Sequence, residues 1–334
     1  MNHEFAVQAL RHMLRIRLFE ERTLEVLMQG KLASTMCHVS IGQEAVAAGV
    51  CMAMQPQDYL TSTHRGHGHL IARGGDLGRM MAELMGKETG YCKGRGGSMH
   101  ITDMALGHLG ANGIVGGHIG IAVGAGLWSK LSANNAVTMC LFGDGAVTEG
   151  VFHEALNMAA VFRLPVVFVC ENNQYAMSLP WSKSTPAVDF KTRAAAYAMP
   201  GIDVDGQDVA AVYQAAREAA ERARRGDGPT LIGAHTYRFF GHSRGDPSAY
   251  RDPEEERRWR ERDPIPLFKA RALSAGWLSQ DDMAALEADA RQAMDDAVQF
   301  AEAAPPARDA VAFEDVYAPS GAHSAERERQ HSTL

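Results

Sequence analysis

Two short apolar runs near the middle of the chain flank a segment with helical spacing. Residues 137–142 and 166–170 are mainly apolar and β-branched, and residues 149–162 between them have the spacing of a helix. A short buried strand, a helix and a second buried strand are typical of a unit with parallel strands. The polar residues after each strand then meet at the carboxyl edge of the sheet, where open α/β sheets bind ligands.

Hydrophobic periodicity predicts further elements on both sides of this unit. Helices are expected at residues 4–29, 40–54, 120–131, 192–198, 208–225, 264–275 and 279–303, with another beginning at Asp252. Strands are expected at residues 59–63, 201–206 and 230–235. The alternation, with no repeat or linker, predicts a single α/β domain over residues 1–318, with a mostly parallel sheet and helices on both faces. Residues 319–334 are expected to form a disordered tail.

A glycine-rich segment, residues 86–126, interrupts this pattern. Its glycines are interleaved with His, Met, Ile and Val, which favours ordered loops whose backbone approaches a cofactor or a neighbouring chain. A surface loop without such a role is the alternative. The segment contains no Gly-x-Gly-x-x-Gly after a strand, which counts against a nicotinamide-dinucleotide enzyme.

Composition narrows the class of protein. The chain has 334 residues, a net charge of −7 and a pI of about 6.1, which argue against a nucleic-acid partner. The five cysteines form no Cys-x-x-Cys pair, and Cys140 and Cys170 fall in predicted buried strands, so free thiols in a reducing compartment are expected. With no apolar stretch long enough for a membrane and no signal-like N-terminus, we expect a cytoplasmic protein with no membrane partner.

The polar residues after the two central strands suit a magnesium–diphosphate site. Asp144 lies between two glycines at the end of the first strand, and Asn173 follows the second. Mg²⁺ is usually bound by few protein oxygens plus substrate phosphates, and glycines let the backbone approach a phosphate closely. The alternative is that Gly-Asp-Gly is only a turn. With Asn172-Asn173 at the end of the next strand, the pair resembles the thiamine-diphosphate-binding motif.

Other polar residues have both functional and structural interpretations. The segment 63–69 contains His64, Arg65, His67 and His69; it could bind a metal, but an Arg with a flanking His at a strand end is better suited to a diphosphate. His242 follows an aromatic and basic run in a Gly-containing loop and is a candidate acid–base group. Glu44 is interpreted as a helix-dipole partner in a first turn.

Taken together, these motifs make residues 5–318 resemble the α subunit of the thiamine-diphosphate-dependent first component of 2-oxo acid dehydrogenase complexes, which implies the thiamine-diphosphate-binding fold. The resemblance implies thiamine diphosphate and Mg²⁺ as cofactors. It implies that Asp144, Asn173 and the main-chain carbonyl of Tyr175 bind Mg²⁺. Gly145 and Ala146 would contact the diphosphate through their backbone.

The same resemblance assigns further residues. His64 and Arg65 match a Tyr-Arg pair that contacts the phosphates, with histidine in place of tyrosine. Gly113 to Val115 match the segment that holds the aminopyrimidine ring, with an apolar side chain that supports the bent cofactor. His242 matches a loop histidine that reaches the reacting centre and helps in acyl transfer; His64 and His242 are thus the expected catalytic residues.

A carboxylate that activates the cofactor's pyrimidine ring is missing from this chain. In the family it comes from a separate β subunit, and the nearest candidates here, Glu44 and Glu149, are both rejected. The resemblance therefore implies an α₂β₂ heterotetramer that is inactive without its β subunit.

The implied reaction is ylide addition to a carbonyl substrate, cleavage to an enamine and transfer of the two-carbon unit to the lipoyl group of an acyltransferase component. Residues 62–69, 87–100 and 110–113 look most like the acetoin dehydrogenase branch, whereas residues 241–243 are closer to the pyruvate dehydrogenase branch. Acetoin is the expected substrate, with pyruvate the alternative and branched-chain 2-oxo acids third. A nicotinamide-dependent Rossmann dehydrogenase and a non-catalytic scaffold subunit remain as other classes.

Overall fold

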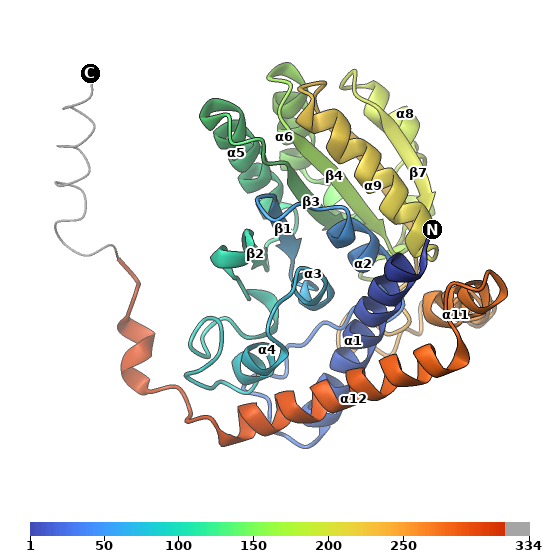
Figure 1. The fold of residues 1–334 in the computed structure, drawn as a ribbon. Helices are drawn as coiled ribbons and strands as arrows, with labels where there is room; N and C mark the ends of the chain where they lie inside the picture. The colour runs from blue at the N-terminus through green and yellow to red at the C-terminus, as the bar shows by residue number, and fades with distance from the viewer. Residues whose placement is uncertain (318–334) are drawn as a thin grey trace.

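The computed structural model describes residues 1–317, and its centre is a sheet of six parallel strands (Figure 1). The strands lie in the order β2-β1-β3-β4-β8-β7. Their bounds are β1 (Tyr59–Thr63), β2 (His108–Asn112), β3 (Thr138–Gly143), β4 (Val166–Asn172), β7 (Gly201–Asp205) and β8 (Thr230–His235). A small antiparallel hairpin, β5 (Tyr175–Ala176) and β6 (Leu179–Pro180), directly follows β4.

Helices cover both faces of the sheet because successive side chains of each central strand point to opposite faces. In β3, Met139 and Leu141 pack in one cluster, and Cys140 and Phe142 pack in another. Helices on the first face are α1 (His3–Met28), α2 (Glu44–Met52), α3 (His67–Ala72), α4 (Leu77–Leu84), α9 (Val209–Arg224) and α12 (Gln280–Ala303). Those on the second are α5 (Gly117–Ser132), α6 (Gly150–Val161) and α8 (Phe190–Ala195).

The remaining elements are short or lie at the ends of the sheet. They are α7 (Trp181–Ser184), α10 (Pro253–Arg260), α11 (Pro264–Ser274) and four 3₁₀ turns, η1 (Gly97–Met99), η2 (Met104–Leu106), η3 (Asp144–Thr148) and η4 (Asp309–Phe313). In Figure 1, α12 runs across α1 and beside α4, which ties the C-terminal part of the chain to the first face.

The strand order places a topological switch point between β1 and β3. From β1 the chain moves outward to β2 and then returns across β1 to form β3. Loops that leave neighbouring strands in opposite directions open a crevice at the carboxyl ends, where α/β sheets bind ligands. The segments after β1, β3 and β4 therefore converge at this edge.

The predicted α/β fold, with its mostly parallel sheet and helices on both faces, is confirmed. Within the glycine-rich segment, however, residues 108–112 form the edge strand β2, because pairing with β1 supplies backbone hydrogen bonds that the sequence pattern does not show. The short helix expected at residues 192–198 instead spans Phe190–Ala195, with Asp189 as its N-cap. α3 and α4 were not predicted.

Two smaller predictions can also be compared with the structure. Cys140 and Cys170 are free and buried in their strands, as expected. Among the helices of residues 1–317, none is long and apolar enough to cross a membrane. The tail predicted at residues 319–334 lies outside the described residues.

Candidate active site

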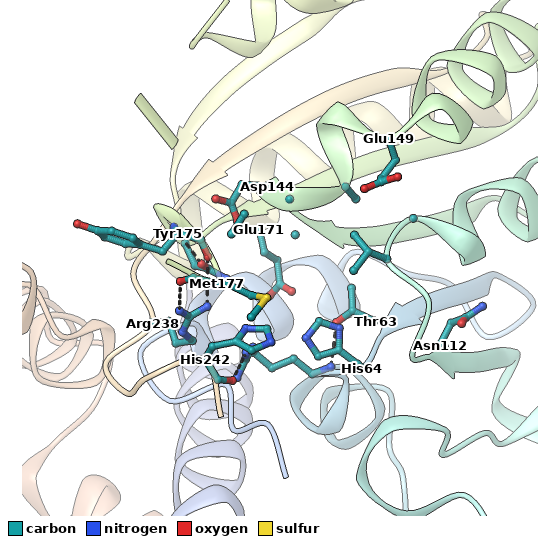
Figure 2. A pocket seen from close by; sticks show the side chains of 18 of the residues that line it. Thr63, His64, Asn112, Asp144, Glu149, Glu171, Tyr175, Met177, Arg238 and His242 are labelled. Atoms are coloured by element: carbon teal, nitrogen blue, oxygen red, sulfur yellow. Dashed lines mark hydrogen bonds between the residues drawn. The ribbon is translucent and has the colours of Figure 1, made fainter. Parts of the chain in front are cut away.

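A cavity of about 310 Å³ lies at the carboxyl edge of the sheet, at the switch point (Figure 2). Every predicted site residue except Gly113 lines it: His64, Arg65, Val115, Asp144, Gly145, Ala146, Asn173, Tyr175 and His242. Gly113 lies beside the cavity, where an added Cβ would come within 3.0 Å of the His100 ring. Its neighbours Asn112, Ile114 and Gly116 line the cavity in its place.

Asp144 and Asn173 are brought together by the pairing of β3 with β4. In that ladder Gly143 is aligned with Glu171, so the residues just after each strand emerge side by side. Asp144 is 3% exposed, yet its Oδ2 atom has no hydrogen-bond partner among the described residues. Burial raises the pKa of Asp144 to about 6. An unpartnered buried carboxylate is costly unless a ligand completes it.

Asn173 is held so that it can take part in the same site. Its Nδ2 donates to Gln43 Oε1 at 3.1 Å, and its Oδ1 accepts a long bond from the backbone N–H of Tyr175 at 3.4 Å. The carbonyl of Tyr175 accepts from Arg238 Nη1 at 3.2 Å, which leaves one lone pair of that oxygen free. Asp144, Asn173 and Tyr175, the three residues expected to bind Mg²⁺, thus all line the cavity.

Two buried guanidinium groups line the cavity without a hydrogen-bonded carboxylate among the described residues. Arg65 donates to the carbonyls of Val39 (2.6 Å) and His242 (2.8 Å). Arg238 donates to the carbonyls of Tyr175, Met177 and Phe240, and Figure 2 shows the first two of these bonds. Burial, and then the charge of Arg238, lowers the pKa of Arg65 to about 9. Buried cations of this kind favour an anionic ligand.

Three histidines gather at one end of the cavity. His64 and His242 line it, and His38, from the segment before α2, lies against both, with ring centroids 4.9 and 5.1 Å from theirs. Burial first, and then the charge of Arg65, lowers the pKa of His38 to about 3, of His64 to about 2 and of His242 to about 4. All three imidazoles are therefore neutral near pH 7.

The other two histidines of the 63–69 segment have structural partners. His67 Nδ1 lies 2.9 Å from Glu20 Oε2 and its Nε2 lies 3.0 Å from Ser98 Oγ. His69 Nε2 lies 3.0 Å from Glu171 Oε2 and its Nδ1 lies 2.7 Å from Ser62 Oγ. The segment therefore does not form a metal site of its own, because the ring nitrogens of His67 and His69 already have protein partners.

Glu44 is more than the helix-dipole partner that the sequence suggested. Glu44 is fully buried, and its two carboxylate oxygens share the backbone N–H of Gly42. It also forms an ion pair with Arg17, which pairs in turn with Asp263. This network fixes the start of α2 against α1 and α11 and does not reach the cavity lining.

Sequence reasoning missed His38, Arg238 and Glu171 as residues of the site. His38 follows no recognisable motif, and Arg238 appeared only as part of an aromatic and basic run. Glu171 directly precedes the Asn pair, so its position at the carboxyl end of β4 was the one signal that could have indicated it.

The chemical groups that line the cavity fit a magnesium-bound diphosphate. It offers an unpartnered carboxylate oxygen at Asp144 and two buried guanidiniums that contact only neutral carbonyls. Gly145 also lines the cavity, and an added Cβ there would lie 3.1 Å from Ala176 Cβ, so the position favours a residue without a side chain. Oxygen donors for a metal ion and cations for an anionic ligand therefore line the same cavity.

A parallel α/β sheet with an anion cradle at its switch point defines a protein of the phosphate-cofactor-binding class. Comparison with known proteins identifies the family: a match to the family described as "Dehydrogenase E1 component" spans residues 11–309. The chain belongs to this family, whose members are thiamine-diphosphate-dependent oxidoreductases.

Similar proteins cover nearly the whole chain. The α subunit of acetoin:2,6-dichlorophenolindophenol oxidoreductase from Bacillus subtilis is 47% identical over 95% of both chains. Its counterpart from Cupriavidus necator is 39% identical over 95% of both. The pyruvate dehydrogenase E1 α subunit of Rhizobium meliloti is 39% identical over 90% of this chain and 86% of its own length. All three are named α subunits, which implies a β subunit as a partner.

Proposed function

We propose that this chain is the α subunit of a thiamine-diphosphate-dependent acetoin dehydrogenase. The unpartnered carboxylate of Asp144 beside Asn173, in a cavity lined by two buried guanidinium groups, is the observation that carries the proposal. The 47% identity with an acetoin oxidoreductase α subunit favours acetoin, and the 39% identity with a pyruvate dehydrogenase α subunit keeps pyruvate as the alternative.

Asp144, Asn173 and the carbonyl of Tyr175 would hold Mg²⁺. Arg65 and Arg238 would neutralise the diphosphate, and the backbone of Gly145 and Ala146 would approach it. The bound cofactor would supply a carbanion that attacks the substrate carbonyl. The chain's own contribution is to bind and orient the cofactor and to place neutral imidazoles at the reacting end of the cavity.

His64 and His242 would act on the substrate as neutral groups. With pKa values of about 2 and 4, set first by burial, each imidazole can both donate and accept a hydrogen bond at neutral pH. They can therefore hold a substrate hydroxyl or carbonyl and pass a proton without gaining a lasting charge.

A β subunit is required because the cavity has no carboxylate placed to activate the pyrimidine ring. Three carboxylates line it: Asp144 would bind the metal, Glu171 is paired with His69, and Glu149 is exposed at the rim. Ile114, on the same rim, is 71% exposed, as expected for an apolar side chain that another chain covers. We propose an α₂β₂ assembly in the cytoplasm that passes the two-carbon unit to a lipoyl-bearing acyltransferase.

The test is co-expression with the β-like chain and assay of the complex with thiamine diphosphate, Mg²⁺ and a dye acceptor. We expect higher kcat/KM on acetoin than on pyruvate, and no activity from the α chain alone. Preference for pyruvate would keep the cofactor chemistry and replace the substrate. Full activity of the single chain would refute the need for a β subunit.

A further inference from the structure

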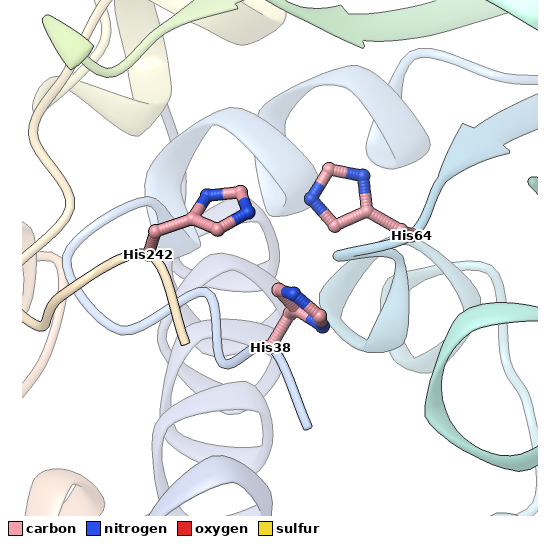
Figure 3. Close-up of side chains that lie close together, drawn as sticks. All are labelled: His38, His64 and His242. Carbon is pink, nitrogen blue, oxygen red and sulfur yellow. The ribbon is translucent and has the colours of Figure 1, made fainter. Parts of the chain in front are cut away.

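His38, His64 and His242 come from three distant segments and turn their rings toward a common space (Figure 3). They lie before α2, after β1 and after β8. The nitrogen atoms that could bind a metal all lie within 4.8 Å of one another. The ring centroids are 4.9, 5.1 and 5.7 Å apart, so no protein side chain fits between them.

Each of the three rings has a buried nitrogen that lacks a hydrogen-bond partner among residues 1–317: His38 Nδ1, His64 Nε2 and His242 Nδ1. Leaving one buried polar atom unpaired costs about 1–3 kcal/mol. Because the three rings form one cluster and each has an unpartnered nitrogen, they point to a ligand that the cluster shares. The rings are also neutral at pH 7, which is the form in which imidazole binds metal ions.

Arg65 holds the three segments in place. Its guanidinium donates to the carbonyl of Val39, next to His38, and to the carbonyl of His242 itself, while His64 precedes it in the chain. One buried side chain therefore holds the three backbone segments together, while the rings can still turn about their side-chain bonds.

We propose that these three histidines form a binding site for a divalent transition-metal ion of the Zn²⁺ or Co²⁺ class, separate from the magnesium site. Three imidazoles with no carboxylate suit such ions and not Mg²⁺ or Ca²⁺, which prefer oxygen. Three protein ligands leave a fourth position open for water or another small ligand. Binding needs nitrogen atoms at about 2.0–2.1 Å from the ion, so the rings must rotate inward from their present spacing.

Occupation of this site blocks the reacting end of the cavity, since two of its three ligands line that cavity. This consequence rests on the proposed function, whereas binding itself does not. The charges of Arg65 and Arg238 oppose the ion, as they oppose protonation of the same rings. The site is therefore expected to bind reversibly and to release its ion to a chelator.

The test is a Co²⁺ titration of the metal-free full-length chain in excess Mg²⁺, followed by visible absorption. Excess Mg²⁺ competes for the oxygen site, and four-coordinate Co²⁺ gives d–d bands far more intense than those of octahedral Co²⁺ bound by oxygen, so the bands report a low-coordinate site. We expect saturable bands at one ion per chain, removed by Zn²⁺ or a chelator. Loss of one of the three ligands, in His38→Gln, should weaken binding by more than about tenfold.

The control is His153→Gln, which removes a histidine on the exposed side of α6 and should leave the titration unchanged. His242→Gln, in a loop, repeats the test should His38→Gln lower the thermal stability of the chain. Absence of d–d bands in the wild-type chain, or bands that survive both cluster variants, would overturn the proposal. These outcomes do not depend on the substrate, so they are distinct from failure of the acetoin assay.

Discussion

Two groups of polar residues present buried side-chain atoms in this protein and differ in one respect. In the first, on α1 and α3, Glu20, His67 and His69 have partners for the atoms they present to the interior. In the second, at the edge of the sheet, Asp144 and the cluster of His38, His64 and His242 each present an atom that has no partner within residues 1–317. The atoms in question are buried in both groups, so burial of the atom does not distinguish them.

The difference separates structural from functional polar residues. A buried group with all its bonds made stabilises the fold, and its removal leaves former partners unpaired. A buried group with a bond unmade destabilises the ligand-free fold and gains its partner when a ligand binds. Stability should therefore depend on the first group and ligand binding on the second.

The largest expected effect is on stability, from Glu20→Leu. Glu20 is fully buried and accepts from Ser40 N (2.9 Å), Ser40 Oγ (2.8 Å) and His67 Nδ1 (2.9 Å). Its loss leaves these donors unpaired and should lower the free energy of unfolding by about 3–5 kcal/mol. Denaturant unfolding measures it, with Glu25→Leu on the exposed face of α1 as a control expected within about 0.5 kcal/mol. A loss below about 1 kcal/mol would contradict the structural role.

Asp144→Asn should weaken ligand binding and leave stability unchanged, the reverse of Glu20→Leu. Losing a direct metal ligand should weaken Mg²⁺-dependent binding of thiamine diphosphate by at least about 100-fold, the upper range for outer-shell changes. The ligand-free thermal midpoint should not fall, because Oδ2 has no partner to lose. Calorimetric titration and thermal melts measure the two quantities, with exposed Asp227→Asn as the control. Unchanged cofactor affinity would exclude Asp144 as a ligand.

The pH dependence of binding sharpens the same comparison. Burial raises the pKa of Asp144 to about 6, and Mg²⁺ binds the carboxylate form. Cofactor affinity should therefore fall as pH drops through about 6, by roughly tenfold per unit. The stability of the ligand-free fold should change with pH in the opposite direction. Because the pKa of Asp144 is raised in the folded state, its protonated form stabilises the fold, and this contribution is lost as pH rises through about 6. The phosphate groups of the cofactor also titrate in this range. The difference between the pH profiles of cofactor affinity for the wild type and for Asp144→Asn therefore isolates the contribution of Asp144. Identical pH profiles would contradict this assignment.

The smallest expected effect is on substrate choice, from His64→Tyr. His64 lines the cavity and presents an unpartnered Nε2, and tyrosine replaces an imidazole with a larger phenol. We expect the ratio of kcat/KM for acetoin over pyruvate to fall by about tenfold. Steady-state assays of the α–β complex measure the ratio, with exposed His153→Tyr as the control. A ratio equal to that of the wild type would show that His64 does not determine substrate specificity.

Local sequence determined the parts of the site that depend on one strand–helix–strand unit. Asp144 and Asn173 directly follow two apolar runs joined by one helix, and consecutive parallel strands of this kind are neighbours in the sheet. Their meeting therefore needed only the hydrophobic pattern. The same reasoning found Arg65 at the end of β1 and the fold class from the alternation of elements.

Tertiary structure alone decided which distant segments share the site. His38 and His242 meet because Arg65 bonds to carbonyls on both segments, one of them 177 residues away. Nothing in the local pattern around His38 or Arg238 records such a contact, and β2 became a strand through pairing with β1. Hydrophobic period fixes local elements and their order, whereas contacts across long loops depend on the packing of the whole chain. The histidine cluster is for that reason visible in the fold and not in the sequence.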